Sequence, residues 1–544
     1  MPLFTKGTMK FTDWLNHHDI TISSKVLIAD LRNSEQGRGV IALDDINKGE
    51  VLFSIPRDSI LNVGNCSLIE DYPDIKQKLV HLTHWESLII VLLYEVLVKG
   101  ENSKWNDYLD VLPVKSAQFN AKQHEETFNQ LMYWNSDELH LLEPSLILER
   151  VGKDLAVSIY NKLYPGIIIE ELGIKELEGK VTLDMYLAIA STIMSYSFDV
   201  EISDFDEQEE NEEEEEVEDE EEEELEEEED DEEKEEGEDN ESKTQSGMEP
   251  RSILMDGYYK SMVPLADTLN ADTNLHNASL TYVDNELVMK SLKAIKKGDQ
   301  IYNTYSDHPN SEILRRYGYV ETQGSKYDFG EIPLNLITKH FEDTTGLTEE
   351  SIKDLLHFVN QIIMEEHEDD ENLVDIVLDS YDCFKSGDVI LELIFLIQIL
   401  TIIAAVDKTE SIMTLEEAPK YQLINRISKK CYQLIESKKL TNQFLENYKA
   451  ILNSRLNQYP KLASQPYEPK IPFTRSKMAE VVLKSEYQSL KNCLDIDKTF
   501  KKNEDLGPFK FIDDEKLIRN IIKKRAQEDS SGEETSSIKK SKTT

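Results

Sequence analysis

Apolar residues at helical spacing mark two long blocks of this chain. The first block runs from about residue 65 to 185, with Trp85–Leu97 as its clearest stretch, and a further helical stretch spans Asp184–Tyr196. The second block runs from about residue 331 to 525, and its clearest stretches are Val389–Val406, Lys420–Ser437 and Lys477–Lys491. Both blocks are therefore predicted to be helical.

Short strand-and-turn patterns lie on either side of the first block. Before it, Gly37–Ala42 and Val51–Pro56 read as two strands joined by a turn, and residues 9–18 precede them as a short amphipathic helix. After it, Gln300–Tyr305 reads as a strand that follows the turn Lys296–Asp299. The helical block is therefore predicted to interrupt a domain of short β-sheets.

The predicted fold class is α+β. Residues 1–330 form the domain of short β-sheets with its helical insert at about 65–185, and residues 331–525 form an all-α domain. Residues 201–250 are mostly Asp and Glu, and self-repulsion predicts that they form a disordered insertion. A long insertion in a surface loop costs little closure entropy, so the first domain can fold around it. The polar tail at residues 526–544 is also predicted to be disordered.

The charge of the chain bears on its partners. The formal net charge is −49, and much of it lies in the insertion. An acidic protein repels the phosphate backbone, which argues against direct nucleic-acid binding and favours a basic protein as partner. The alternative reading, in which the insertion is only a solvated spacer, remains open at this point.

Three features bear on the compartment. Glu392 and Gln398 interrupt the most apolar run, which favours a buried helix over a membrane span. No apolar segment typical of a signal peptide follows Met1. The cysteines are far apart and form no CxxC pair, so neither structural zinc nor a disulfide framework is indicated, and a reducing compartment is expected: they are Cys66, Cys383, Cys431 and Cys493.

Four short segments carry the candidate chemistry. Gly37-Arg38-Gly39 lets the backbone approach a ligand closely, and Met194–Phe198 places Tyr196 and Ser197 at the end of a predicted helix. Pro264–Ala271 contains Asn270, whose amide offers a donor and an acceptor together, as an adenine edge requires. The fourth segment supplies several phenols, in Tyr302-Asn303-Thr304-Tyr305 and Arg315-Arg316-Tyr317-Gly318-Tyr319. Each segment taken alone is more often an ordinary turn or core position than a functional site.

Taken together and in this order, the segments resemble the SET-domain methyltransferases of the Rubisco large-subunit methyltransferase type, and in particular the fungal ribosomal lysine N-methyltransferases. Gly37-Arg38-Gly39 resembles the strand that opens the SET domain, and Asp267–Ala271 resembles the D-x-x-N-H element of the family. Thr304-Tyr305 with Tyr317-Gly318-Tyr319 resembles the catalytic tyrosine and the Y-G-F/Y motif. Thr474–Glu480 resembles a helix start in the all-helical C-terminal domain.

The resemblance implies roles for individual residues. Tyr305 is the implied catalytic residue, Trp105 and Ser197 are implied to face the substrate, and Asp267 is expected to anchor its strand. Relatives usually have His where this chain has Ala271, which leaves the contribution of that position to cofactor affinity open. The implied cofactor is S-adenosylmethionine (AdoMet), without a metal, and the residues implied to hold it are Gly37, Arg38, Gly39, Tyr196, Asn270, Ala271, Tyr305 and Tyr317.

The same resemblance suggests monomethylation, by a monomeric enzyme, of a lysine in a basic protein of the large ribosomal subunit. Basic clusters at Lys523–Arg525 and Lys539–Lys542 could direct the chain to the nucleus, with the cytoplasm as a further location, or could simply solubilise the tail. Three other functions remain open from the sequence: a non-enzymatic acidic scaffold for basic proteins, a histone-lysine methyltransferase and a protein-histidine methyltransferase.

Overall fold

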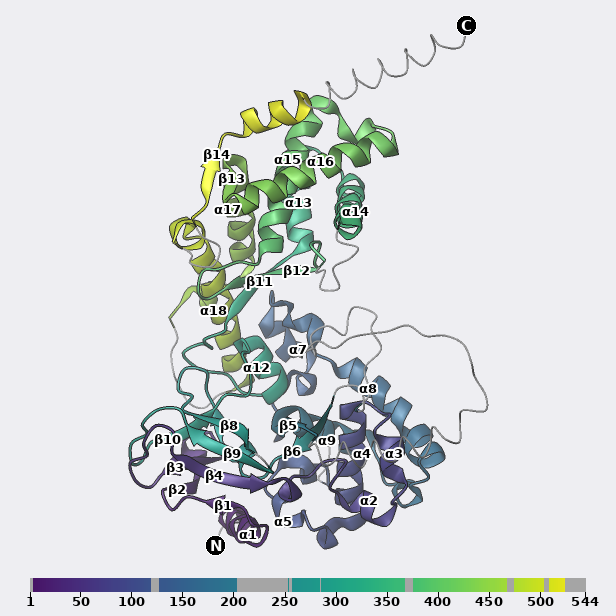
Figure 1. The fold of residues 1–544 in the computed structure, drawn as a ribbon, viewed down its shortest axis with the longest axis vertical. Helices are drawn as coiled ribbons and strands as arrows, with labels where there is room; N and C mark the ends of the chain where they lie inside the picture. The colour runs from purple at the N-terminus through teal and green to yellow at the C-terminus, as the bar shows by residue number, and fades with distance from the viewer. Residues whose placement is uncertain are drawn as a thin grey trace. The chain divides into compact units, whose positions relative to one another are not determined.

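The computed structural model describes residues 3–118, 127–202, 253, 257–283, 285–366, 375–466, 474–502 and 508–523 (Figure 1). Nearly all of the predicted acidic insertion, residues 203–250, and the predicted tail at 526–544 lie outside these ranges. The chain divides into two compact units. The first contains residues 1–134, 151–306 and 314–319, and the second contains residues 135–150, 307–313 and 320–544. This division lies close to the boundary inferred at residue 330, although residues 135–150 and 307–313 pack with the second unit.

The first unit is built on short β-sheets. One four-stranded sheet has the order β1-β4-β9-β8, another has the order β2-β3-β10-β7, and β5 pairs with β6 (Figure 1). The strands are β1 (Thr21–Ile22), β2 (Val26–Asp30), β3 (Arg38–Ala42), β4 (Val51–Pro56), β5 (Ser197–Glu201), β6 (Tyr258–Met262), β7 (Asn270–Ala271), β8 (Ala278–Val283), β9 (Glu286–Ser291) and β10 (Gln300–Asn303). The predicted strands Gly37–Ala42 and Gln300–Tyr305 correspond to β3 and β10, which pair in one sheet across the helical block. The predicted strand Val51–Pro56 is β4, which pairs with β9 in the other sheet.

The helical insert of the first unit is formed as predicted. The helices of this unit are α1 (Leu3–His17), α2 (Ser67–Asp71), α3 (Ile75–Leu79), α4 (His84–Tyr94), α5 (Asn106–Leu109), α8 (Lys153–Lys162) and α9 (Leu183–Tyr196). A capping box starts α4, because the Thr83 side chain accepts from the Glu86 amide while the Glu86 carboxylate accepts from the Thr83 amide. The helix predicted at 9–18 begins earlier, at Leu3, and buries Phe11 and Leu15.

The second unit is mainly helical, and α15 forms its buried centre. Its helices are α7 (Ser136–Leu139), α13 (Leu334–Thr345), α14 (Glu349–Glu366), α15 (Leu391–Glu410), α16 (Glu417–Glu436), α17 (Asn442–Gln458) and α18 (Arg475–Cys493), and α12 (Asn310–Tyr317) begins in this unit. Packing of α15 against α16 and α17 buries most of the predicted apolar run, from Leu393 to Ala404 (Figure 1). The polar Gln398 in that run is satisfied by the amide and hydroxyl of Thr441.

The expectation that this unit is exclusively helical was wrong in one respect. Strands β11 (Phe329–Pro333) and β12 (Ser380–Phe384) pair antiparallel, and β13 (Lys439–Thr441) and β14 (Lys510–Ile512) pair in parallel. These strands are three to five residues long. Segments this short carry almost no periodic pattern of their own, and their partners are distant in sequence.

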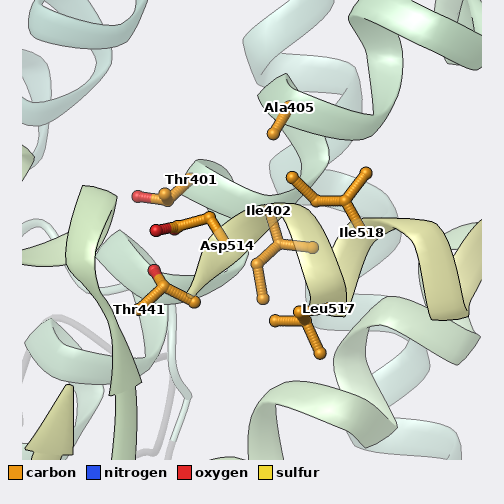
Figure 2. A pocket seen from close by; sticks show the side chains of 7 residues that line it. All are labelled: Thr401, Ile402, Ala405, Thr441, Asp514, Leu517 and Ile518. Carbon is orange, nitrogen blue, oxygen red and sulfur yellow. The ribbon is translucent and has the colours of Figure 1, made fainter. Parts of the chain in front are cut away.

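A shallow pocket in the second unit is lined by residues from α15, from the end of β13 and from the C-terminal segment (Figure 2): Thr401, Ile402, Ala405, Thr441, Asp514, Leu517 and Ile518. The Asp514 carboxylate accepts from the amide of Gln443 at 3.2 Å, so it caps the start of α17. The pocket lies apart in sequence from the four candidate segments. No helix in the described ranges has the length and hydropathy that a membrane span needs.

Candidate active site

Strand pairing brings three of the four candidate segments together. β10 pairs in parallel with β7, with Tyr302 opposite Asn270 and Asn303 opposite Ala271. On its other side β10 pairs antiparallel with β3, the strand that contains Gly39. The Gly-Arg-Gly strand, the asparagine segment and the start of the tyrosine segment are therefore neighbours in one sheet, although they are far apart in the sequence.

Gly39 permits a close approach of the neighbouring side chains, and Gly37 permits the backbone turn before the strand. A Cβ atom on Gly39 would lie 2.6 Å from Leu31 Cδ1 and 2.8 Å from Asn270 Nδ2, so only glycine leaves room for these groups. Asn270 Nδ2 donates to the main-chain oxygen of Arg38 at 3.2 Å. Gly37 has a φ of +61°, a left-handed conformation that favours glycine. The strand and Asn270 thus form one hydrogen-bonded wall.

The side chain of Arg38 faces the N-terminal helix. Its guanidinium donates to Thr8 Oγ1 at 3.0 Å, to the Phe4 main-chain oxygen at 3.4 Å and to the Val111 main-chain oxygen at 3.1 Å. It also lies over the Phe4 ring, 4.1 Å from its centroid. The side chain is therefore engaged in holding α1, and it is the main chain of Arg38 that borders the site.

Tyr305 stands in a cluster of phenols. Its ring centroid lies 4.8 Å from that of Tyr317 and 6.5 Å from that of Tyr319. The Tyr305 hydroxyl donates to the main-chain oxygen of Leu269 at 2.9 Å, and the Tyr319 hydroxyl donates to that of Ala271 at 3.4 Å. Both hydroxyls are thus anchored on the asparagine segment, and the lone pairs of the Tyr305 oxygen remain able to accept a hydrogen bond.

Tyr305 and Tyr196 are neutral near pH 7. Burial, with further contributions from Tyr196, Tyr317 and Asp267, raises the pKa of Tyr305 well above its ordinary value. Burial also raises the pKa of Tyr196 to about 12, an effect that Asp267 strengthens and Arg38 opposes. Tyr305 therefore acts as a neutral hydrogen-bonding group and not as a base.

Comparison with known proteins decides what this site is. A SET-domain family model matches residues 37–306. The chain is 39% identical to "Ribosomal lysine N-methyltransferase 4" of Saccharomyces cerevisiae, over 99% of this chain and 98% of the relative. The chain is a SET-domain protein-lysine N-methyltransferase. It is therefore an enzyme and not the catalytically inactive scaffold that its acidity left open, and its methyl donor is AdoMet.

Two further similarities agree with this family. The chain is 28% identical to "N-lysine methyltransferase setd6" of Salmo salar, over 62% of this chain and 63% of the relative. Solved structures of Rubisco LSMT, bound to AdoMet or to sinefungin and monomethyllysine, match with a TM-score of 0.55 and 16% identity, over 94% of this chain and 95% of that chain. At this identity the match to the solved structures shows the fold alone.

The methyltransferase site contains groups that suit AdoMet. The predicted cofactor residues other than Gly39 are half-buried, so they line a surface. The buried amide nitrogen of Gln300 has no hydrogen-bond partner within the described residues, and it lies 3.0 Å from the position of a Cβ on Gly39. This unused donor, beside the Asn270 amide, suits the acceptor atoms of a nucleoside or a carboxylate. The described ranges contain no group of three or more His, Cys, Asp or Glu side chains that could hold a metal.

The methyltransferase also contains a buried hydrogen bond between Tyr108 and Asp267 that the sequence did not predict. The Tyr108 hydroxyl, from α5, donates to Asp267 Oδ2 at 2.6 Å. Burial raises the pKa of Asp267 to about 7, although its hydrogen bonds with Tyr108 and Thr268 oppose the rise. Asp267 was expected to anchor its strand, and Tyr108 was not singled out, since nothing in its local sequence marks it.

The end of α9 and the segment of Tyr317 are held together. Ser195 Oγ donates to the main-chain oxygen of Arg316 at 2.9 Å and accepts from Gln130 Nε2 at 2.9 Å. Gly318 has a φ of +72°, and a Cβ there would lie 3.0 Å from the main-chain nitrogen of Gln130. Ser197, which was predicted to face the substrate, follows Tyr196 directly. It begins β5, pairs with Met262 and is half-buried.

Trp105, also predicted to face the substrate, lies elsewhere. Its side chain is fully buried, and its ring centroid lies 5.7 Å from that of Trp14 in α1 and 6.5 Å from that of His18. A side chain with no exposed surface cannot contact a protein substrate in this conformation. The predicted substrate-binding role of Trp105 is therefore wrong in this structure. Trp105 instead packs α1 against the helical insert.

Substitution of Gly39 by Ala should weaken AdoMet binding by about fivefold. The added Cβ displaces the Asn270 amide from the Arg38 oxygen, and loss of one such hydrogen bond costs about 1 kcal/mol. Titration calorimetry with AdoMet measures the change. Gly166→Ala is the matched control, because a Cβ there meets nothing within 4 Å. Equal AdoMet affinities for the two folded variants would contradict this account of the strand.

Proposed function

We propose that this enzyme, acting as a monomer in the nucleus and also in the cytoplasm, adds one methyl group to a lysine of a basic protein of the large ribosomal subunit. The similarity to the ribosomal lysine N-methyltransferase of Saccharomyces cerevisiae carries the proposal, because it extends over 99% of this chain. The net charge of −49 supports a basic substrate, since opposite charge increases the rate of encounter.

The reaction needs a neutral amine at a defined position. A lysine amine has an ordinary pKa of about 10.4, so it is almost fully protonated at neutral pH. Entry into a dry channel lowers that pKa, and a nearby cation lowers it further. When bound, AdoMet supplies a methyl group on a positively charged sulfur, which becomes a neutral thioether as the methyl carbon bonds to the nitrogen. The proton that the nitrogen then releases passes to water.

Tyr305 is positioned to orient that amine. Its O–H is donated to Leu269, so its oxygen can accept an N–H of the neutral amine and direct the nitrogen lone pair. The raised pKa of Tyr305 keeps the phenol neutral, so no negative charge is present that would favour the protonated amine. Catalysis by this site is then mainly positioning together with fixed dipoles.

The phenol cluster supports transfer of a single methyl group. The three rings of Tyr305, Tyr317 and Tyr319 lie with their centroids 4.8 to 6.5 Å apart. Their hydroxyls make the surroundings of Tyr305 polar as well as crowded, which disfavours a bulkier, already methylated amine. A histidine substrate would need an additional polar partner for its second ring nitrogen, and a histone lysine would be equally basic, so the substrate experiment includes both alternatives.

The experiment that tests the proposal is methylation of separated ribosomal proteins and histones with radiolabelled AdoMet, followed by mass spectrometry of the labelled protein. We expect one labelled large-subunit protein with one methyl group on one lysine, and no label with Tyr305→Phe. Tyr160→Phe is the matched control, because its hydroxyl makes only a 3.4 Å bond to Val181 within the helical insert. Label on a histone or on a histidine would overturn the proposed substrate.

The proposed location has a separate test. The basic clusters Lys523–Arg525 and Lys539–Lys542 lie almost wholly outside the described residues, and the proposal assigns them to nuclear import. Replacement of both clusters by Ser should move a fluorescent fusion from the nucleus to the cytoplasm. Unchanged nuclear fluorescence would contradict the assignment.

A further inference from the structure

The Tyr108–Asp267 pair has no part in the chemistry described above, although it adjoins the residues that carry it. The Tyr108 side chain is fully buried, and Asp267 is 5% exposed. Besides the Tyr108 hydroxyl, Asp267 accepts from the Thr268 hydroxyl at 3.3 Å. Asp267 lies in the turn that leads directly to Leu269, the residue that receives the Tyr305 hydroxyl, and to Asn270. A buried carboxyl group thus lies next to the Gly39 strand and Asn270, the predicted cofactor residues.

Among the described residues, this carboxyl has no ion-pair partner. Its titratable neighbours are phenols from three elements, Tyr108 on α5, Tyr196 on α9 and Tyr305 after β10, and all three have raised pKa values. The cation of the group, Arg38 on β3, interacts with Tyr196 and is hydrogen-bonded to α1 and Val111.

We infer that ionised Asp267 lets the site discriminate by charge, favouring the cationic methyl donor AdoMet over its neutral product, S-adenosylhomocysteine. The two ligands share the adenosine and amino-acid groups, and they differ in the methyl group and the positive charge on sulfur. In a buried site an unpaired carboxylate interacts strongly with a ligand cation, because little water screens the two charges. Asp267 is therefore a positioning residue that acts without touching the reacting atoms, and it helps the product to leave once the charge on sulfur is gone.

The inference has a definite pH dependence. Burial raises the pKa of Asp267 to about 7, so the carboxyl changes from neutral to ionised within the working range of the enzyme. AdoMet favours the ionised form and so lowers that pKa, whereas the neutral product does not. By linkage, the preference for AdoMet is small below this pKa and increases as the pH rises through it. The phenols stay protonated throughout, because their pKa values are raised further from neutrality.

The test is titration calorimetry of the full chain with AdoMet and with S-adenosylhomocysteine between about pH 5.5 and pH 8.5. The ratio of their dissociation constants should change in favour of AdoMet by about five- to tenfold over this range, as expected if the bound cation lowers the Asp267 pKa by about one. The Asp267→Asn variant should lose this change, and it also measures any pH dependence that belongs to the ligands themselves. The amide oxygen can still accept from Tyr108, which preserves the buried hydrogen bond.

A second variant separates charge from structure. Tyr108→Phe removes the hydrogen bond that lowers the pKa of Asp267, so the midpoint of the affinity ratio should move to higher pH. Near-ultraviolet circular dichroism at both ends of the range confirms that each variant is folded. A ratio independent of pH in the unmodified enzyme, or an identical pH dependence in Asp267→Asn, would overturn the inference. Both outcomes are independent of which protein is methylated.

Discussion

Replacement of Tyr305 by Phe should lower kcat by about 100- to 1,000-fold, the usual effect of removing one oriented hydrogen-bonding group from a polar transition state. The phenol is neutral, and its hydroxyl is fixed by the Leu269 oxygen at 2.9 Å. Phe retains the ring, which packs 4.8 Å from that of Tyr317, but removes the oxygen that accepts the amine. Single-turnover kinetics with radiolabelled AdoMet and the substrate protein measure the chemical step.

The binding of AdoMet separates this effect from damage to the site. We expect the dissociation constant of AdoMet for Tyr305→Phe to stay within a few-fold of that of the unmodified enzyme, because the Gly39 strand and Asn270 are unaltered. Tyr282→Phe is a second control. The Tyr282 hydroxyl, on β8, donates to the main-chain oxygen of Asp199 on β5 at 2.6 Å, and neither strand belongs to the sheet of β3, β7 and β10. A Tyr305→Phe enzyme with normal kcat would remove Tyr305 from the catalytic role.

The parts of the site that the sequence predicted are those in which local chemistry limits the choice of residue. Gly39 must be glycine because a side chain would collide with Leu31 and Asn270, and such a constraint leaves a recognisable motif. Asn270 is recognisable because its amide suits an adenine edge and because Asp267–Ala271 resembles the D-x-x-N-H element of the family. The departure at Ala271 is also explained in part, because that residue contributes its main-chain oxygen to the Tyr319 hydroxyl and pairs with Asn303 through the backbone.

The parts that escaped prediction depend on contacts between distant segments. Tyr108 and Asp267 are separated by 159 positions in the sequence. Neither this spacing nor the residues around them indicate that the two side chains form a hydrogen bond. Trp105 was assigned to the substrate by resemblance, because relatives have a Trp near the substrate cleft at this place. The helix α1 that covers it lies about ninety residues earlier, as the 90-residue separation of the Trp14–Lys104 hydrogen bond shows. Burial of this kind is a property of the folded chain and not of a motif.

The stability of the helical second unit depends on a buried arginine, Arg455. Arg455→Met should lower the free energy of unfolding of that unit by about 3–5 kcal/mol, the usual cost of removing one partner from a buried charged network. Arg455 is 2% exposed and donates to the main-chain oxygens of Glu331 at 2.7 Å and Pro144 at 3.0 Å. Met retains much of the apolar bulk, so the loss reports on charge and hydrogen bonding.

The loss should be larger at pH 8.5 than at pH 6, because of the buried Glu486. Burial raises the pKa of this carboxyl to about 7, and Arg455 opposes the rise, so without Arg455 the pKa is higher still. A carboxyl with a raised pKa in the folded state destabilises the fold increasingly as the pH rises from the unfolded pKa through the folded one. At pH 6 Glu486 can take up a proton, and part of the penalty disappears.

The chain offers a way to locate the effect of Arg455→Met. All four tryptophans, Trp14, Trp85, Trp105 and Trp134, lie in the first unit, whereas far-ultraviolet circular dichroism is sensitive to the helices of both. Urea unfolding should show an earlier transition by circular dichroism, with a smaller change in tryptophan fluorescence. Arg519→Ala, which removes only the exposed pair with Glu515, should leave both transitions nearly unchanged. If Arg455→Met behaved like Arg519→Ala, Arg455 would not stabilise the buried carboxylates, because an uncompensated charge in the interior cannot be neutral in energy.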